Sequence, residues 1–215
     1  MHASFPNESE SYRSARNKLL AEEIALRGQV ERVAALRRSL PEGGEVTGDY
    51  VFAALDGRRI SFVDLFGNSD TLLIYSLMYS ENAEAPCPMC CGFLDGLSPQ
   101  TRNLPKGLSI AVVANSNTEN LRDLKTSRNW TGVDLYSAAS TTYQRDYLAE
   151  TEDGAQLPIM NVFVRKNDRV HHFWGSELFF ADSPWHPRHL DQMWPLWNIL
   201  DVTPQGRGDH LPSTK

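Results

Sequence analysis

Three cysteines, Cys87, Cys90 and Cys91, lie close together in the segment EAPCPMCCGF, residues 84–93, and the chain has no others. Cys87 and Cys90 form a C-x-x-C pair. This spacing serves thiol–disulfide exchange or metal binding, and in both cases the reactive species is the thiolate. The segment therefore indicates redox chemistry, a metal clamp, or neighbouring small residues that are simply buried.

Cys87 is predicted to stand at the mouth of a helix that follows a buried strand. Pro88 suits the first helical turn, where its missing N–H costs nothing. The unpaired N–H groups and the dipole of the helix then face the Cys87 sulfur and favour its anion. Such a position lowers a cysteine pKa from about 8.5 into the range of about 3.5 to 7.5. Cys87 is therefore the predicted nucleophile.

Cys90 is the predicted resolving thiol, because it lies one helical turn after Cys87. An i,i+3 pair satisfies the Cα separation of roughly 4.4 to 6.8 Å that a disulfide needs. Cys87 would attack a substrate disulfide, and Cys90 would resolve the mixed disulfide. Cys91, at i+4 from Cys87, is an alternative accessory thiol; its plainest interpretation is a small buried residue.

A metal site is the less favoured interpretation. The chain has no second C-x-x-C, so a four-cysteine zinc site is excluded. A metal would need histidines, and His171, His172, His186 and His189 are interpreted as surface or hydrogen-bonding residues. We expect no metal and no cofactor, although soft thiolates keep Cu(I) binding open as an alternative.

A second part of the site is predicted at Leu157 and Pro158, just before an apolar strand. A cis-proline there would present backbone groups to an extended substrate beside the sulfurs, together with Pro88 and Met89. The competing interpretation is an ordinary trans proline that opens an edge strand.

Composition limits the function classes. The 215 residues carry a net charge of −6, which argues against a nucleic-acid partner. No apolar run approaches the roughly 18 residues of a membrane span, and the first residues lack a secretory pattern. We expect a cytoplasmic protein without membrane contacts, where clustered cysteines indicate catalysis more often than a permanent disulfide.

The elements that position the cysteines are an N-terminal helix over residues 9–40 and an α/β domain. The helix carries an apolar stripe that would pack on its own domain or form a homodimer. Residues 1–45 are the predicted helical extension, and residues 46–215 the domain. The expected strands of the domain are 50–55, 60–63, 71–79, 108–116, 133–138, 160–164 and 170–174. Three helices are expected in the domain. The first begins near Cys87, the second has Thr118 as its N-cap, and the third spans about residues 189–200. This order predicts a mixed sheet flanked by helices.

With these residues the chain resembles the thioredoxin-like superfamily over about residues 46–200. The resemblance rests on three segments: DYVFAALDGRRISFVDLFG, TLLIYSLMY before Cys87-Pro88-Met89-Cys90, and Pro158 before a hairpin. More narrowly it is similar to a bacterial family of unknown function labelled predicted dithiol-disulfide oxidoreductases, through YRSARNKLLAEE, CPMCCGF, NVFVRKNDRVHHFW and LDVTPQGR. The resemblance implies a thioredoxin-like sandwich, cis-Pro158, a disulfide substrate and a reducing partner.

The chain departs from thioredoxin in two respects. The dipeptide between the cysteines is Pro88-Met89, not the Gly-Pro of thioredoxin. The strand TLLIYSLMY lacks the buried carboxylate that thioredoxin uses to move protons; water, Glu81, Glu84 or a histidine could substitute. The entry strands and the segment VVANSNTENLRDLK also resemble peroxiredoxins, but those carry Thr or Ser three residues before the reactive cysteine, where this chain has Glu84. A peroxidase, a copper-binding module and a redox sensor therefore stay as alternatives to the oxidoreductase.

Overall fold

The computed structural model describes the chain except residues 1–3, 168, 183, 185–189, 210–211 and 213–215. The chain divides into two compact units, Met1–Pro41 and Glu42–Lys215. Each unit is described by itself, and the predicted boundary between residues 45 and 46 stays a prediction.

The first unit consists mainly of one helix, α1 (Glu10–Arg38). Ser9 caps it, because the Ser9 hydroxyl accepts a hydrogen bond of 3.1 Å from the backbone N–H of Tyr12. Glu10 lies in the first turn, and two arginines lie in the last turn, where their charges oppose the helix dipole. The long N-terminal helix predicted over residues 9–40 is confirmed.

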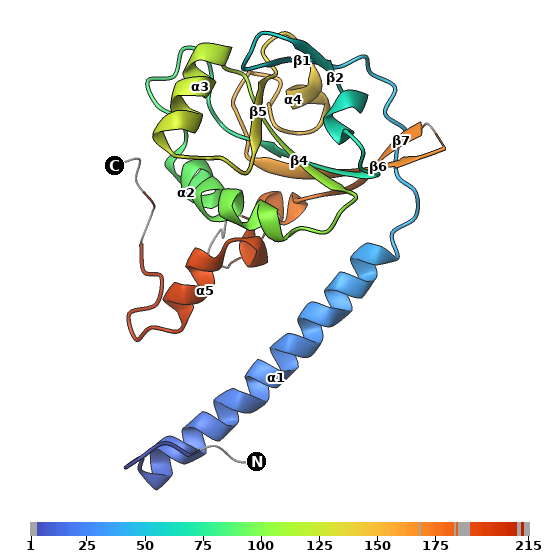
Figure 1. Ribbon diagram of the computed structural model, residues 1–215. Helices are drawn as coiled ribbons and strands as arrows, with labels where there is room; N and C mark the ends of the chain where they lie inside the picture. The colour runs from blue at the N-terminus through green and yellow to red at the C-terminus, as the bar shows by residue number, and fades with distance from the viewer. Residues whose placement is uncertain (1–3, 168, 183, 185–189, 210–211, 213–215) are drawn as a thin grey trace. The chain divides into compact units, whose positions relative to one another are not determined.

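The second unit contains the seven-stranded sheet (Figure 1). Its strands are β1 (Val51–Ala54), β2 (Arg59–Ser61), β3 (Thr71–Ser76), β4 (Leu108–Ala114), β5 (Asp134–Ser137), β6 (Ile159–Lys166) and β7 (Arg169–Gly175). Its α-helices are α2 (Pro88–Leu97), α3 (Thr118–Ser127), α4 (Tyr143–Asp146) and α5 (Pro195–Asp201). Short 3-10 helices are η1 (Val63–Phe66), η2 (Ser98–Asn103), η3 (Glu177–Phe180) and η4 (Asp191–Met193).

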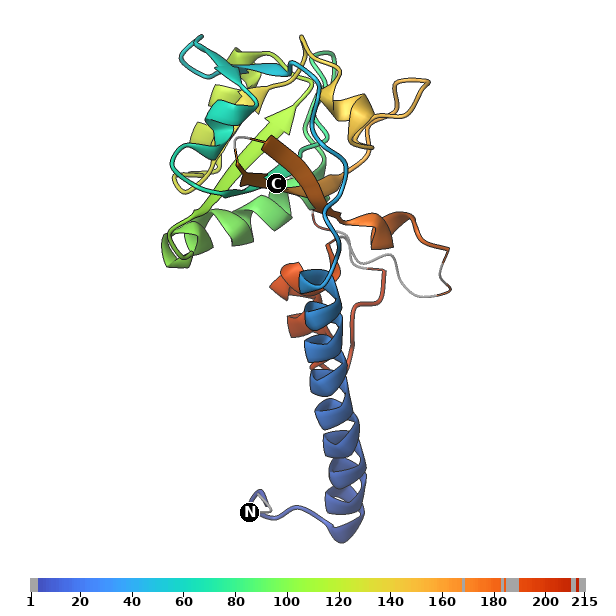
Figure 2. The same cartoon turned by 90° about the vertical axis from the view of Figure 1, so that its right-hand side faces the viewer.

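The strand order is β2-β1-β5-β4-β3-β6-β7. Strands β3, β4 and β5 run parallel, joined by helices α2 and α3, and the remaining pairings are antiparallel. The predicted β6–β7 hairpin lies at one edge of the sheet (Figure 2). Because β3 and β4 are parallel neighbours, their carboxyl ends meet at one edge, where the cysteine segment begins.

Helices cover both faces of the sheet. Buried residues of α2, α3 and α5 form one core cluster with one face, and those of η1 and α4 form a second cluster with the other. Strand β3 lies between them: Leu72 and Ile74 belong to the second cluster, whereas Tyr75, and Leu77 just after the strand, belong to the first. This position explains why TLLIYSLMY is a nearly continuous apolar run and does not alternate.

Two predicted helices begin at other residues than expected. Asn117, not Thr118, is the N-cap of α3: its backbone is extended, and its side-chain oxygen accepts a hydrogen bond of 2.8 Å from the N–H of Asn120. The predicted last helix is shorter than expected, since Trp194 is extended and α5 begins at Pro195. Its predicted first residue, His189, lies outside the described residues.

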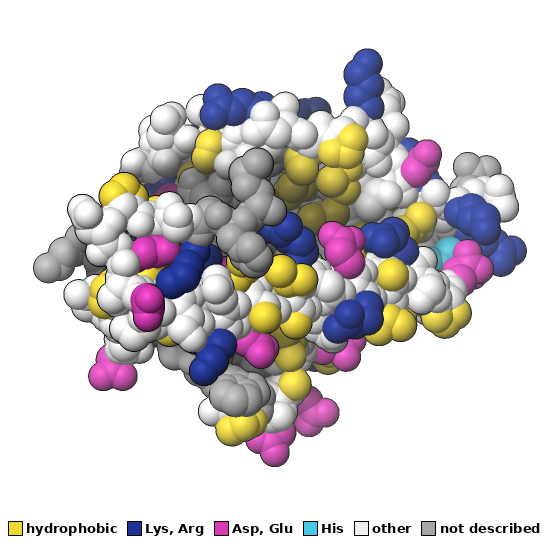
Figure 3. Space-filling model, turned by 90° about the horizontal axis from the view of Figure 1, so that it is seen from below, with side chains coloured by type: hydrophobic (Ala, Val, Ile, Leu, Met, Phe, Trp, Pro, Cys, Tyr) yellow, Lys and Arg dark blue, Asp and Glu magenta, His cyan; other side chains and the backbone are white. Residues whose placement is uncertain are grey.

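Among the described helices, none combines the length and hydropathy that a membrane span requires. Figure 3 shows apolar side chains interspersed with both positive and negative ones on the face that it presents.

Candidate active site

The site begins where β3 ends and α2 starts. Cys87 is the N-cap of α2, and Pro88 is the first residue of the helix, as predicted. The backbone N–H of Cys87 donates to the carbonyl oxygen of Met78 at 3.0 Å, and the Cys87 carbonyl accepts from the N–H of Cys91 at 3.0 Å. These two bonds fix the sulfur at the helix mouth, half-buried beside the sheet edge.

The Cys87 sulfur lies among hydrogen-bond donors that favour its anion. A hydrogen bond from the Cys90 thiol is the largest cause, and the backbone N–H groups of Cys90 and Met89 add to it. Burial opposes them, yet the pKa of Cys87 is lowered to about 6. Cys87 is therefore mostly thiolate at neutral pH.

Cys90 has the opposite character. Its side chain is fully buried, and burial raises the pKa of the Cys90 thiol well above its usual range. The hydrogen bond to Cys87 and the charge there also raise it, whereas the Tyr75 hydroxyl and the backbone N–H of Met78 act as donors that lower it. The two cysteines thus form an unequal pair, with an outer anion and an inner protonated thiol.

Cys91 is buried and lies under different influences. Burial raises the pKa of this thiol to about 12, while the Arg128 guanidinium lowers it and the Asp95 carboxylate raises it. Cys91 therefore stays protonated and packed in the core at neutral pH. All three cysteines are free thiols.

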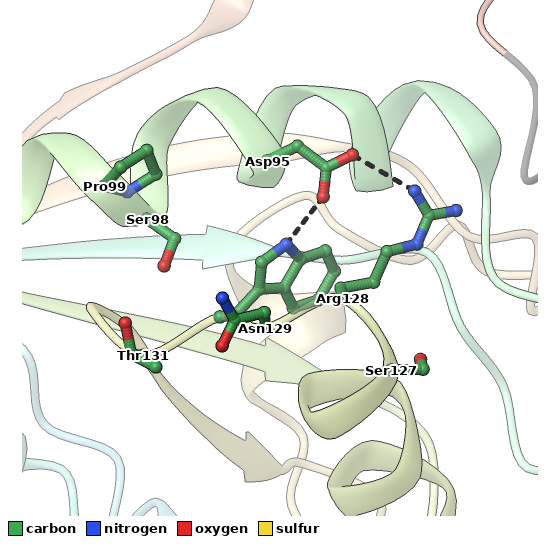
Figure 4. A pocket seen from close by; sticks show the side chains of 8 residues that line it. Asp95, Ser98, Pro99, Ser127, Arg128, Asn129 and Thr131 are labelled. Carbon is green, nitrogen blue, oxygen red and sulfur yellow. Dashed lines mark hydrogen bonds and ion pairs between the residues drawn. The ribbon is translucent and has the colours of Figure 1, made fainter.

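The far end of α2 is tied to the end of α3. Asp95 accepts a hydrogen bond of 2.8 Å from the Trp130 indole N–H and pairs with Arg128 at 3.1 Å (Figure 4). These side chains line a polar hollow of about 670 Å³. Asp95 lies eight residues after Cys87, or roughly 12 Å along the helix axis, so this hollow is separate from the Cys87 sulfur.

The middle of α2 contacts the C-terminal segment. At Gly92, an added Cβ would lie 2.9 Å from the Trp194 ring, so only glycine permits this approach. Trp194 also packs edge-on against Phe93, with ring centroids 6.5 Å apart, and against Trp197 at 5.0 Å. This contact holds the glycine-containing helix, whose intrinsic propensity is low.

The expectation of a cis bond before Pro158 is wrong, because no described peptide bond is cis. Leu157 donates its N–H to the Ala149 carbonyl at 2.8 Å, and the chain enters β6 directly with Ile159 opposite Ser76. A trans proline fits this extended entry into a strand. Pro158 is buried, whereas Leu157, Pro88 and Met89 are half-buried. Their role in substrate binding stays a prediction.

The histidines take part in other contacts. His172 Nε2 lies 2.9 Å from the Asn161 amide oxygen, and His171 Nδ1 lies 3.1 Å from the Gly43 carbonyl. His186 and His189 fall outside the described residues. Within the described part of the chain, no three His, Cys, Asp or Glu side chains are grouped as metal ligands would be.

Tyr75 is a member of the site that was not predicted from the sequence. Its position in an unbroken apolar run did not indicate which face of the sheet it occupies. The sequence carried one usable signal, since Tyr75 is a hydroxyl-bearing residue within the apolar run that precedes Cys87. The exposed carboxylates of Glu81 and Glu84 take no part in the contacts of Cys90 described above.

The sheet order, with a cysteine pair at the helix after a central strand, defines a thioredoxin-like α/β protein. Within this class, the chain belongs to the family described as bacterial protein of unknown function (DUF899), which matches residues 2–215. No curated protein matches the sequence.

Several solved structures are similar to this chain. A peroxiredoxin-like protein from Aquifex aeolicus is 13% identical, with a TM-score of 0.48 over 64% of this chain and 75% of that one. Peroxidoxin BcpB from Mycobacterium tuberculosis is 14% identical, with a TM-score of 0.49 over 75% of this chain and 98% of that one. A secreted disulfide oxidoreductase from the same organism is 12% identical, with a TM-score of 0.42 over 67% and 91%.

Proposed function

We propose that the protein is a thiol–disulfide oxidoreductase in which Cys87 is the nucleophile and Cys90 the resolving thiol. The observation that carries this proposal is the unequal pair: an outer sulfur with a pKa of about 6, hydrogen-bonded by a buried inner thiol. A thiolate at neutral pH is what disulfide exchange requires of the attacking group.

The reaction runs in two exchanges. The Cys87 thiolate attacks one sulfur of the substrate disulfide, and the other sulfur leaves as a thiolate. Cys90 then loses its proton to that thiolate or to water and attacks Cys87, which releases the second substrate thiolate. The protein ends with a Cys87–Cys90 disulfide, oxidised by two electrons, and the substrate disulfide is reduced by two.

The pair also sets the order of these exchanges. In the resting state, burial is the largest cause that keeps Cys90 protonated, and the hydrogen bond to Cys87 and the charge there add to it. Once Cys87 is bound in a mixed disulfide, the two influences of Cys87 disappear while burial persists, and the pKa of Cys90 falls. The resolving thiol is thereby activated only after the first exchange has occurred.

The proposed partners follow from this chemistry. A protein or small-molecule disulfide is the substrate, held beside Pro88, Met89, Leu157 and Pro158, and a separate reductant restores the dithiol. The reaction needs no cofactor. A cytoplasmic location and a homodimer through α1 remain part of the proposal.

Reduction of insulin by dithiothreitol tests the proposal. The wild-type protein should accelerate it, and Cys87→Ser should abolish the acceleration, whereas Cys91→Ser should retain it. Acceleration that survives Cys87→Ser contradicts the proposal. Consumption of hydrogen peroxide without insulin reduction would favour the peroxidase, and a tight Cu(I) complex without either activity would favour the copper-binding module.

A further inference from the structure

Tyr75 lies directly under the first turn of the cysteine helix. It occupies β3 between Val112 of β4 and Met160 of β6, so its backbone is held from both sides. Its side chain is fully buried on the α2 face, where its ring packs against Phe93 with centroids 5.0 Å apart. The phenol is thus fixed by the sheet and by the helix together.

The Tyr75 hydroxyl reaches the Cys90 sulfur, which is also fully buried. Because the Cys90 thiol in turn donates to Cys87, the three groups form a chain of hydrogen bonds that runs from the core to the half-exposed sulfur. The backbone N–H of Met78 is a second donor to Cys90. The inner sulfur therefore has donors in place before it carries a charge.

We propose that Tyr75 is the positioning residue of the resolving step: its hydroxyl holds the Cys90 sulfur toward Cys87 and donates to it when Cys90 becomes the attacking thiolate. This inference rests on the proposed dithiol function. No proton leaves Tyr75, since burial keeps the phenol protonated. The proton of Cys90 goes to the leaving substrate thiolate or to water, and Tyr75 stabilises the anion that remains.

The groups that act on Cys90 can be named from each neighbouring element. They are Cys87 at the helix mouth, Tyr75 from β3 and the backbone of Met78 in the following loop. Asp95 and Arg128 act on the neighbouring Cys91 thiol. In the mixed disulfide the Cys87 charge is lost, so burial alone opposes ionisation of Cys90 and the two remaining donors favour it.

Two opposing effects decide how much Tyr75→Phe slows resolution by Cys90. In Tyr75→Phe, the Cys90 thiolate loses one hydrogen bond. Loss of one hydrogen bond to a charged group lowers the fraction of Cys90 present as thiolate about tenfold to hundredfold at neutral pH. A more basic thiolate is a better nucleophile, and this recovers nearly half of the loss on a logarithmic scale. Resolution in Tyr75→Phe should therefore be about three- to tenfold slower than in the wild type.

Single-turnover reaction with the aromatic disulfide dithiobis(nitrobenzoate) separates the two steps. Each exchange releases one coloured nitrothiobenzoate, so the first phase reports attack by Cys87 and the second reports resolution by Cys90. Tyr75→Phe should slow the second phase and displace its pH dependence to higher pH. The first phase and its midpoint should stay close to those of the wild type.

The matched control is Tyr143→Phe, which removes the hydroxyl of an equally buried tyrosine from the other core cluster. It should change neither phase. An unmoved second phase in Tyr75→Phe overturns the inference, and so does an equal slowing of both phases with unchanged midpoints. If Tyr75→Phe loses the first phase through misfolding, fluorotyrosine at position 75 replaces it: the stronger donor should move the second midpoint to lower pH, and an unmoved midpoint overturns the inference.

Failure of the underlying function gives a different result. In that case the wild-type protein itself lacks the second phase, or Cys90→Ser retains it. The inference about Tyr75 is judged in a protein that shows both phases and loses the second one in Cys90→Ser.

Discussion

The hydrogen bond from the Cys90 thiol to Cys87 predicts how the nucleophile responds to substitution at position 90. With a pKa of about 6, Cys87 is about 90% thiolate at pH 7. A cysteine with the ordinary pKa of about 8.5 would be about 3% thiolate at that pH. The arrangement thus raises the reactive fraction about thirtyfold.

Cys90→Ala removes the largest cause of this shift and leaves the two backbone N–H donors. A hydrogen bond to a charged group is worth about 1.5 to 3 kcal/mol in a buried setting, or about one to two pKa units. The pKa of Cys87 in Cys90→Ala should therefore rise from about 6 to roughly 7 to 8. Cys90→Ser keeps an O–H donor and should stay near the wild-type value.

The rate of Cys87 alkylation by iodoacetamide, followed by mass spectrometry across pH, measures the midpoint directly. The sign is fixed by the chemistry: the thiolate is lost as the pH falls through the pKa, so reactivity decreases below about pH 6 in the wild type. Cys91→Ala is the control and should leave the midpoint in place. Equal midpoints in Cys90→Ala and Cys90→Ser would refute the hydrogen bond as the cause. A wild-type midpoint near that of free cysteine would refute the reasoning about the helix mouth as well.

Three further predictions concern stability. Gly92→Ala should lower the free energy of unfolding by about 1 to 3 kcal/mol, because its Cβ would lie 2.9 Å from the Trp194 ring. Gly96→Ala, in the same helix, meets nothing within 4 Å and should stabilise by about 0.5 to 1 kcal/mol; similar melting temperatures for the two variants would contradict the contact. Asp95→Ala should cost about 1 to 3 kcal/mol in urea unfolding because the buried indole N–H loses its acceptor, whereas Asp95→Asn, which keeps an acceptor oxygen, should cost less. Ser9→Ala should reduce the stability of α1 by about 1 kcal/mol, and unchanged helicity on heating would argue against the cap.

Local chemistry made much of the fold predictable. Pro88 after Cys87 places a helix start, and an apolar run such as residues 71–79 suits a strand covered on both faces. These are properties of a few consecutive residues. The N-cap of α3 was misplaced by one position for the same reason, since Asn117 and Thr118 are both good caps. The extended backbone of Asn117 and its hydrogen bond from the Asn120 N–H distinguish them in the structure.

The remaining features depend on contacts between distant segments. The isomer of the Leu157–Pro158 bond is set by the chain path from Ala149 into β6, which the dipeptide itself does not reveal. Likewise, the hydroxyl of Tyr75 meets Cys90 only because α2 packs on one particular face of β3. The residue types indicated a dithiol, but the groups that make its two sulfurs unequal come from tertiary packing.

The three thiols differ in their exposure to solvent, so the number that reacts reports whether the chain is folded. In the native protein a water-soluble thiol reagent meets Cys87, whereas Cys90 and Cys91 are both 0% exposed. With an alkylating reagent, which Cys90 cannot displace, a folded, reduced molecule should therefore bind one label promptly, and an unfolded one should bind three. The stoichiometry of labelling would count folded chains in a preparation without any enzymatic substrate.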